Sequence, residues 1–373
     1  MQLYDTARRE VVPFTPGEVV TMYTCGITPY DSAHIGHAAV YVTYDVLQRR
    51  LRDLGHRTLC VRNITDVDDD ILRKARELGV HYLDLAAGEI ARFDSDMEAL
   101  GLLAAYSEPR ATSAIPDILG FIGMVLATGH AYRAGGAVYF DVSSFPRFGQ
   151  VSHLERDEMI ELAALRGGHP EDPFKDDPLD FVLWQPSAPG EPSWESLWGP
   201  GRPGWHIECS ALAMRELGTT IDLHGGGSDL IFPHHECECA QSEAATGSLF
   251  VRHWMHVGMV SLGGEKMSKS LGNLVFVHQL LEEGHDPAAI RLALLAKSYR
   301  TGWEWSDSTL VDAEDRLDRW RAAGRGEAAL ELVRARLDDD LDTPGAIGAI
   351  DEEAGAGRGI SEAALLLGVA LTN

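Results

Sequence analysis

Two short segments of this chain carry residue types that can bind and polarise phosphate groups. The first, His34-Ile35-Gly36-His37, stands where an apolar run gives way to a helical pattern. Unpaired backbone N–H groups at a helix N-terminus favour phosphate, and two imidazoles three residues apart share one helical face. Gly36 has no side chain that would block a nucleotide. We expect His34 and His37 to donate hydrogen bonds to phosphate oxygens. The simpler alternative is a pair of capping or surface histidines.

The second segment, Lys266-Met267-Ser268-Lys269-Ser270, lies far downstream between Gly263-Gly264 and Gly272. When a carboxylate attacks the α-phosphate of ATP, negative charge accumulates on the departing pyrophosphate. Mobile ammonium groups that close over it stabilise the transition state more than the ground state. We therefore expect Lys266 and Lys269 to be catalytic, with a solvated turn as the alternative. Together the two segments predict adenylation of a carboxylate.

A glycine run between these segments predicts the adenosine site. Gly225-Gly226-Gly227-Ser228-Asp229 follows a predicted strand and precedes a helix that Pro233 opens. Glycines allow the backbone to lie flat against an adenosine, and an acidic side chain there can accept hydrogen bonds from ribose hydroxyls. We expect Asp229 to have that role.

The segment His234-His235-Glu236-Cys237-Glu238-Cys239 is dense in metal-ligand types. Residues four apart share a helical face, so His234 and Glu238 can converge on one ion, and sulfur ligands from elsewhere would favour zinc. Spacing does not identify those sulfurs, because Cys25 and Cys209 are far apart in the sequence. A polar helix start with two buried thiols remains the alternative.

The elements that must position these residues form a β-α-β pattern. Val19–Thr24 and Thr58–Val61 are predicted strands, and the helix between them ends at Gly55. Its apolar stripe recurs every three or four residues at Val40, Tyr44, Leu47, Leu51 and Leu54. This pattern predicts a parallel, doubly wound sheet with ligands at the carboxyl ends of its strands.

Further along, the chain divides into parts with different patterns. Leu83, Ala86, Ile90, Phe93, Met97 and Leu100 form an apolar stripe of a packed helix, whereas residues 102–204 are irregular and rich in Pro and Gly. We predict a nucleotide-binding first half at 1–101, an inserted connective region at 102–204, a second half with the lysine loop at 205–305, and a helical C-terminal region at 306–373, including a helix over 330–341. The acidic run 66–70 is expected to start a helix rather than bind metal.

Composition limits the class of protein. The 373 residues are 45% hydrophobic and 24% charged, and no apolar run approaches the roughly 20 residues that span a membrane. No secretory signal precedes the first strand, so a cytoplasmic location is expected. The five cysteines are odd in number and scattered, which favours thiols or metal ligands over disulfides. A net charge of −25 disfavours a nucleic-acid partner.

The motifs resemble those of class I aminoacyl-tRNA synthetases, and those of cysteinyl-tRNA synthetase over about 300 residues. The resemblance lies in Cys25-Gly26, Tyr30-Asp31, 34–37, 61–66, 204–210 and 232–238. It implies a class I synthetase-type Rossmann nucleotide-binding domain and a zinc ion held by Cys25, Cys209 and His234, with Glu238 as a further candidate. Zinc would take the thiolate of substrate cysteine, which a shape-selecting pocket separates from serine by only about 100-fold.

Three departures point to the mycothiol ligases, a related family. The turn reads Cys25-Gly26-Ile27-Thr28-Pro29-Tyr30-Asp31, where synthetases usually carry Gly-Pro-Thr-Val-Tyr, and 165–170 is similar to the E-R-G-G-D-P segment of the ligases. The helical region that follows residue 338 leaves no room for a complete anticodon-binding domain. By resemblance, ATP and the cysteinyl-adenylate are held by Cys25, Gly26, Ile27, Thr28, Val40, Asn63, Ile64, Thr65, Trp205, Gly227, Ser228, Asp229 and Val260.

The resulting hypothesis is an ATP-dependent ligase that forms cysteinyl-adenylate and transfers cysteine to the amine of glucosaminyl-inositol. Zinc is the expected metal, and ATP is used with Mg²⁺. No tRNA, no membrane and a monomeric state are expected. The alternatives are a cysteinyl-tRNA synthetase and a non-catalytic protein that only binds cysteine or an adenylate. Sequence does not identify the sugar-binding residues or the group that accepts the amine proton.

Overall fold

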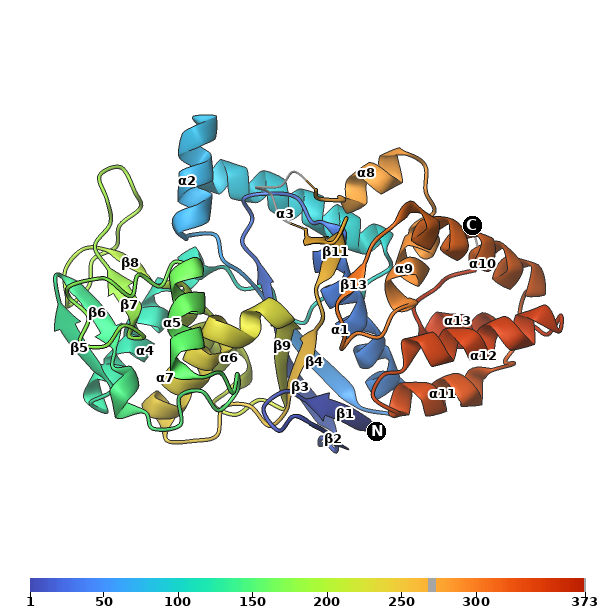
Figure 1. The fold of residues 1–373 in the computed structure, drawn as a ribbon, viewed down its shortest axis with the longest axis horizontal. Helices are drawn as coiled ribbons and strands as arrows, with labels where there is room; N and C mark the ends of the chain where they lie inside the picture. The colour runs from blue at the N-terminus through green and yellow to red at the C-terminus, as the bar shows by residue number, and fades with distance from the viewer. Residues whose placement is uncertain (268–272, 372–373) are drawn as a thin grey trace.

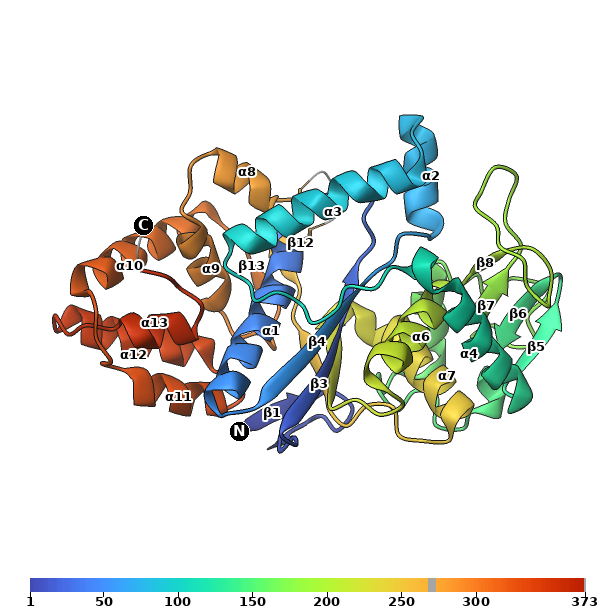
Figure 2. The same cartoon turned by 180° about the vertical axis from the view of Figure 1, so that it is seen from behind.

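A parallel sheet of four strands forms the centre of the molecule (Figures 1 and 2). The computed structural model describes residues 1–267 and 273–371. Neighbouring strands follow the order β10-β9-β3-β4, and all three pairings are parallel. The bounds are β3 Val19–Ile27, β4 Arg57–Ile64, β9 Leu223–Gly227 and β10 Trp254–Val257. The predicted α/β class with a parallel sheet is confirmed, and both predicted strands lie within β3 and β4.

Helix α1 (Ile35–Asp53) makes the crossover from β3 to β4. Tyr44, Leu47 and Leu51 of its predicted stripe are buried against the sheet. Leu54 does not belong to that stripe: it follows the last helical residue and is 43% exposed. The helix ends there because Gly55 takes a φ of 93°, a conformation that favours glycine.

The acidic run starts a helix, as predicted. Asp68 accepts a hydrogen bond from the backbone N of Ile71, and Asp69 and Asp70 lie in the first turn of α2 (Asp69–Leu78). Helix α3 (Tyr82–Ala99) follows and buries most of its predicted stripe, although Leu83 in its first turn is 38% exposed.

A second, antiparallel sheet lies in the part of the chain between α3 and α6, and Figure 1 shows it on the left. Its strand order is β5-β6-β7-β8. Glu236 of α7 attaches this part to the parallel half, because its carboxylate accepts hydrogen bonds from the backbone N of Gly149, Val151 and Ser152. The elements are η1 Ala111–Ala114, α4 Ile115–Ala127, β5 Ala131–Ala134, β6 Ala137–Phe140, η2 Val142–Ser144, α5 Arg156–Leu165, β7 Phe181–Gln185 and β8 Arg202–Pro203.

The chain then returns to the parallel sheet and adds a small three-stranded sheet of order β12-β11-β13. The short helical segments η3 and η4 join β9 to α7, with a cis peptide bond between Phe232 and Pro233. The elements are α6 Trp205–Leu217, η3 Ser228–Leu230, η4 Ile231–His235, α7 Glu236–Thr246, β11 Val260–Leu262, β12 Glu265–Lys266 and β13 Trp303–Glu304.

Helices form the C-terminal region, which packs beside α1 (Figure 2). The predicted helix over 330–341 ends at Asp338, because Asp340 and Leu341 have φ angles of 54° and 52°. The helices are α8 Val277–Glu282, α9 Pro287–Leu295, α10 Asp307–Ala323, α11 Leu330–Asp338, α12 Thr343–Gly355 and α13 Ser361–Leu366, and the N-terminal hairpin comprises β1 Gln2–Asp5 and β2 Glu10–Pro13.

The predicted four-part division with boundaries at 101, 204 and 305 stays a prediction. The buried apolar side chains gather in two clusters, one around α1 and the C-terminal helices and one around α4, α6 and α7. Within the described residues, no helix combines the length and the apolar character that crossing a membrane requires.

Candidate active site and metal centre

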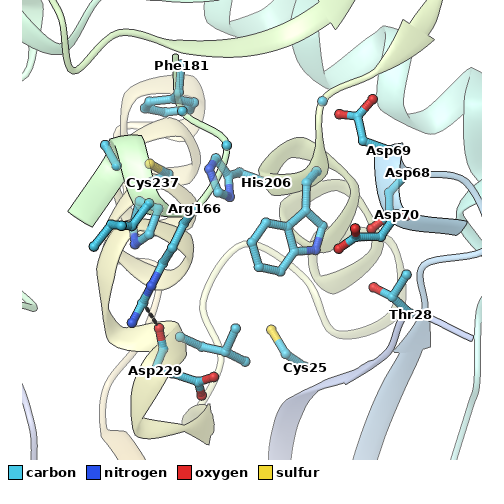
Figure 3. A pocket seen from close by; sticks show the side chains of 18 of the residues that line it. Cys25, Thr28, Asp68, Asp69, Asp70, Arg166, Phe181, His206, Asp229 and Cys237 are labelled. Carbon is cyan, nitrogen blue, oxygen red and sulfur yellow. Dashed lines mark hydrogen bonds between the residues drawn. The ribbon is translucent and has the colours of Figure 1, made fainter. Parts of the chain in front are cut away.

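A cavity of about 1560 Å³ opens at the carboxyl ends of β3 and β9 and extends to the antiparallel sheet. Figure 3 shows Cys25, Thr28, His206 and Asp229 around this space. Many of the residues predicted to bind nucleotide or adenylate line it, namely Cys25, Gly26, Ile27, Thr28, His34, His37, Val40, Trp205, Gly227, Asp229 and Val260. Their binding roles stay predictions.

The two predicted catalytic histidines begin α1 at the wall of the cavity. His34 caps the helix, with its Nδ1 accepting from the backbone N of Gly36 at 3.0 Å. The rings of His34 and His37 stack with centroids 3.9 Å apart. A Cβ on Gly36 would lie 2.8 Å from the His34 ring, so the stacked pair requires glycine there. The turn thus presents two imidazoles and a helix N-terminus to the same space.

The lysine-rich segment lies partly outside the described residues. Lys266 is in β12, but its side chain and the whole of Lys269 are not among the residues that the structure describes. Met267 is buried and lines the cavity, as does Val260 of β11. The strands that lead into the segment are therefore beside the cavity, and the roles of the two lysines stay predictions.

Asn63, Ile64, Thr65 and Ser228 are not on the wall of the large cavity. Asn63 is buried and supports the turn after β3: its Oδ1 accepts from the backbone N of Gly26 at 2.8 Å, and its Nδ2 donates to Thr65 Oγ1 at 3.1 Å. The approach is close, because a Cβ on Gly26 would lie 1.6 Å from the carbonyl oxygen of Asn63. Asn63 thus fixes the end of β3, whose residues Cys25, Gly26 and Ile27 line the cavity.

Four candidate metal ligands converge beneath the cavity, although they come from β3, α6, η4 and α7. The ligand atoms of Cys25, Cys209, His234 and Glu238 all lie within 4.8 Å of one another. Cys25 Sγ is 3.9 Å from Cys209 Sγ and 3.4 Å from Glu238 Oε1, and that oxygen is 3.0 Å from His234 Nε2. All four side chains are buried.

This donor set suits zinc. Two sulfurs, one imidazole nitrogen and one carboxylate oxygen are borderline-soft ligands in a tetrahedral number. Burial alone would raise the pKa of Glu238, but His224 and His234 outweigh it and lower that pKa to about 2. Among the described residues, no lysine or arginine forms an ion pair with this carboxylate. A buried anion without such a partner fits a bound cation.

Histidines surround the four ligands, and sequence reasoning assigned no role to most of them. His206 Nδ1 lies 2.8 Å from His234 Nδ1, which leaves His234 Nε2 directed at the ligand group. Trp205 lines the cavity and stacks on His234 with centroids 4.1 Å apart. His224, His235 and His256 lie on the other side of the group. The quoted motifs contained His206 and His235, but spacing gave no signal for His256.

Arg166 links the antiparallel part to the segment between β9 and α7. It follows α5, and its guanidinium donates to the carbonyl oxygens of Asp229 and Phe232 (Figure 3). Asp229 lies in η3, and Phe232 breaks the helical pattern of η4 with φ −136° and ψ 137°. Arg166 thereby holds the segment that carries both Asp229 and His234.

Comparisons with known proteins agree with this arrangement. Residues 11–315 match the family described as tRNA synthetases class I (C) catalytic domain. A protein of Thermobifida fusca named L-cysteine:1D-myo-inositol 2-amino-2-deoxy-alpha-D-glucopyranoside ligase is 50% identical over 363 residues, covering 95% of this chain and 88% of its own. One of the same name from Thermomonospora curvata is 48% identical over 391 residues, covering 100% of this chain and 94% of its own.

Solved structures show the same fold at low sequence identity. A Mycobacterium tuberculosis methionyl-tRNA synthetase in complex with methionyl-adenylate superposes with a TM-score of 0.70 at 17% identity, covering 95% of this chain and 88% of that one. A LeuRS–tRNA–LeuAMS complex from Agrobacterium radiobacter gives a TM-score of 0.61 at 12% identity, covering 96% and 83%. These two likenesses concern the fold alone.

Proposed function

Because the chain belongs to the class I (C) tRNA synthetase catalytic-domain family, and within it to the group of L-cysteine:glucosaminyl-inositol ligases, we propose that its cavity joins these two substrates. The enzyme is an ATP-dependent ligase of mycothiol biosynthesis. It activates cysteine as cysteinyl-adenylate, releases pyrophosphate, and forms an amide with the amino sugar as AMP leaves. The main support is that the four-ligand group lies directly beneath the cavity whose wall carries His34 and His37.

The metal centre selects the amino acid. Cys25, Cys209 and His234 would hold zinc, with Glu238 either as a fourth ligand or as a charge beside it. When bound, zinc supplies a soft Lewis acid that takes the cysteine thiolate and rejects the serine hydroxyl. Thr28 and Trp205 line the cavity next to this point and would bound the rest of the amino acid.

Adenylation depends on hydrogen-bond donors and cationic side chains placed around the phosphates of ATP. The carboxylate of cysteine attacks the α-phosphate, and the bond to pyrophosphate breaks. His34, His37 and the start of α1 face the phosphates, where donors fixed in advance stabilise the developing charge without reorganising. Lys266 and Lys269 would close over the leaving group. Asp229 is held by Arg166 for the ribose, with Gly227 against the adenosine.

The second step requires a neutral amine at the acyl carbon. A sugar ammonium must lose its proton before it attacks, either to a nearby carboxylate or through desolvation in the closed cavity. The proposal also includes zinc as the natural metal, a monomer in the cytoplasm, and no use of tRNA.

A side-by-side acceptor experiment tests this function. Purified protein with ATP and cysteine should exchange pyrophosphate, form the amide with glucosaminyl-inositol, and leave tRNA uncharged. Charging of tRNA with no turnover of the amino sugar would instead identify a cysteinyl-tRNA synthetase. Absence of cysteine-dependent exchange would identify a binding protein without catalysis.

A further inference from the structure

Two fully buried histidines beneath the cavity have no place in the function proposed above. His224 lies in β9 and His235 immediately precedes α7. With Cys25 and Glu238 they form a second group of four residues whose ligand atoms all lie within 4.8 Å of one another. This group shares Cys25 and Glu238 with the first group but replaces Cys209 and His234.

The carboxylate of Glu238 contacts a histidine of each group. Its Oε1 is 3.0 Å from His234 Nε2 and 3.4 Å from Cys25 Sγ, whereas its Oε2 is 3.1 Å from His224 Nε2. On the same inner side, His235 Nε2 is 3.2 Å from Cys25 Sγ. Glu238 Oε1 also lies 4.0 Å from His235 Nε2, so this carboxylate contacts ligands of both groups, as Cys25 Sγ does.

His235 is oriented as a metal-ligating histidine is. Its Nδ1 lies 2.7 Å from His256 Nε2, and His256 Nδ1 lies 2.7 Å from Thr6 Oγ1. Ligating histidines usually have the ring nitrogen that faces away from the metal fixed by such an outer partner. His206 does the same for His234 in the first group. Each group therefore contains a histidine whose Nε2 is aimed at Glu238 and Cys25.

A purely structural hydrogen-bond network explains the inner group less well. Buried polar atoms are normally satisfied within such networks, yet His224 Nδ1 is buried without a hydrogen-bond partner among the described residues. The ring of His224 stacks on Trp254 with centroids 4.9 Å apart. Aromatic surroundings of this kind do not compensate the charge of Glu238, whereas a cation between the four ligands would.

We propose that the metal centre has two overlapping positions, an outer one at Cys25, Cys209, His234 and Glu238 and an inner one at Cys25, His224, His235 and Glu238. The proposal rests on the proposed metal centre and extends it. One zinc-like ion occupies either position, because the shared ligands serve one ion at a time. In the outer position the ion lies beneath Trp205 and His206, which line the cavity. In the inner position it lies toward Trp254 and His256, so the ion is retained but does not reach the cysteine thiol.

A matched pair of cysteine substitutions separates the two positions. Cys209→Ser removes an outer ligand only, and the purified variant should keep its zinc while cysteine-dependent pyrophosphate exchange falls by at least about 100-fold. Cys25→Ser removes a ligand common to both positions and should lose the zinc. Zinc per chain is measured by elemental mass spectrometry on protein shown to be folded by circular dichroism. If Cys25→Ser does not fold, Glu238→Gln tests the other shared ligand.

The inner ligands are tested in the same background. His235→Ala added to Cys209→Ser should remove the retained zinc, whereas His235→Ala alone should keep zinc in the outer position. A folded Cys209→Ser protein without zinc would overturn the inner position, as would zinc retention that does not depend on His235. A wild-type protein that binds no zinc would refute the whole proposed centre, so the two failures are distinguishable.

Discussion

Two regions of the molecule bury ionisable side chains completely, and they differ in how the charge is balanced. One is the junction between α1 and the C-terminal helices, where Arg291 of α9 is fully buried. Its guanidinium donates to the carboxylate of Asp45 and to the carbonyl oxygens of Leu367 and Leu100, the last two at 2.7 and 3.1 Å. Asp45 also accepts from the backbone N of Leu103.

The metal centre is the other region, where the partners of the carboxylate are histidines and not arginines. At the junction, burial alone would raise the pKa of Asp45, but Arg291 and Arg49 hold this pKa below its ordinary value. The pKa of Glu238 is held low by His224 and His234 instead, and although burial opposes it, Glu238 and Cys209 in turn raise the pKa of His234 to about 10. The thiol of Cys209 lies in the same space, with its Sγ 3.9 Å from Cys25 Sγ.

The difference lies in whether residues of the chain supply all the partners of a buried charged group. At the junction every charge ends on a group of this chain, so its role is to fasten helices to the sheet. At the centre, sulfur, nitrogen and oxygen ligands face one another, and a cation bound among them would take the place of the proton that His234 otherwise carries. A metal-binding site can thus be recognised where buried ligand atoms face one another without an arginine or lysine to pair with them.

Removing the metal should have the largest effect. Treatment with a strong chelator should lower cysteine-dependent pyrophosphate exchange by about 10⁴-fold, because both substrate selection and binding depend on the ion. The melting temperature should fall as well, since a ligand that binds only the folded state stabilises it. Added zinc should restore both. If protein shown to contain no metal kept full pyrophosphate exchange, the centre would not depend on a bound cation and would not differ from the junction in this respect.

Breaking the junction should affect stability and leave the metal in place. Arg291→Met leaves Asp45 buried with an incomplete set of partners, which we expect to cost about 3–5 kcal/mol in the free energy of unfolding. Urea denaturation measures this, and zinc content should stay at the wild-type level. The matched control is Arg334→Met, which breaks a more exposed pair with Asp53 and should change stability little. Equal losses in both variants would contradict the proposed role of burial.

Much of the fold could be predicted because its signals are local. The stripe of α1 repeats at helical spacing, and Gly55 marks its end within two residues. The end of α11 could not be predicted, because contacts from distant residues decide it. Asp340 accepts from the backbone N of Tyr4 and from the hydroxyl of Tyr299, and these contacts accompany a backbone conformation that ends the helix.

The metal centre was only partly accessible from sequence. Spacing placed His234 and Glu238 on one helical face, whereas Cys25 and Cys209 are separated by 184 positions and were named only through family resemblance. His256 had no signal at all, because it lies on a strand and reaches the centre through His235. Contacts of this kind depend on how β10 pairs with β9, which no local pattern records.

Arg166 offers a smaller test of how the region around the centre is held. Arg166→Ala removes both hydrogen bonds to the Asp229 and Phe232 carbonyls, each worth about 1.5–3 kcal/mol when the donor is charged. Part of that is regained from water in the open cavity, so we expect the KM for ATP to rise about tenfold. Zinc content should not change. Arg166→Lys should recover part of the loss, and an unchanged KM for ATP would show that Asp229 needs no support from α5.

Asp68 is a third desolvated carboxylate, after Asp45 and Glu238. It tests through pH whether a buried carboxylate without a compensating cation takes up a proton. Burial first of all, and then the neighbouring Asp70 and Asp69, raise its pKa to about 7, although the Ile71 N–H opposes this. The folded state therefore keeps a proton that the unfolded state has lost above its ordinary value of 3.8. The stability that Asp68 contributes is fully present below that value and is lost as the pH rises toward about 7.

Asp68→Asn should remove this loss while keeping a side chain that caps α2 well. Relative to wild type, the free energy of unfolding of the variant should rise progressively between pH 4 and about pH 7 and then level off, for a final gain of at most about 4 kcal/mol. The matched control, Asp69→Asn, removes the same charge from an exposed position that pairs with Arg202, and it should show no comparable rise. A pH-independent difference for Asp68→Asn would mean that its carboxylate is compensated after all, as that of Asp45 is at the junction. Asp68 would then no longer be an example of a buried carboxylate that takes up a proton because the chain supplies no cation.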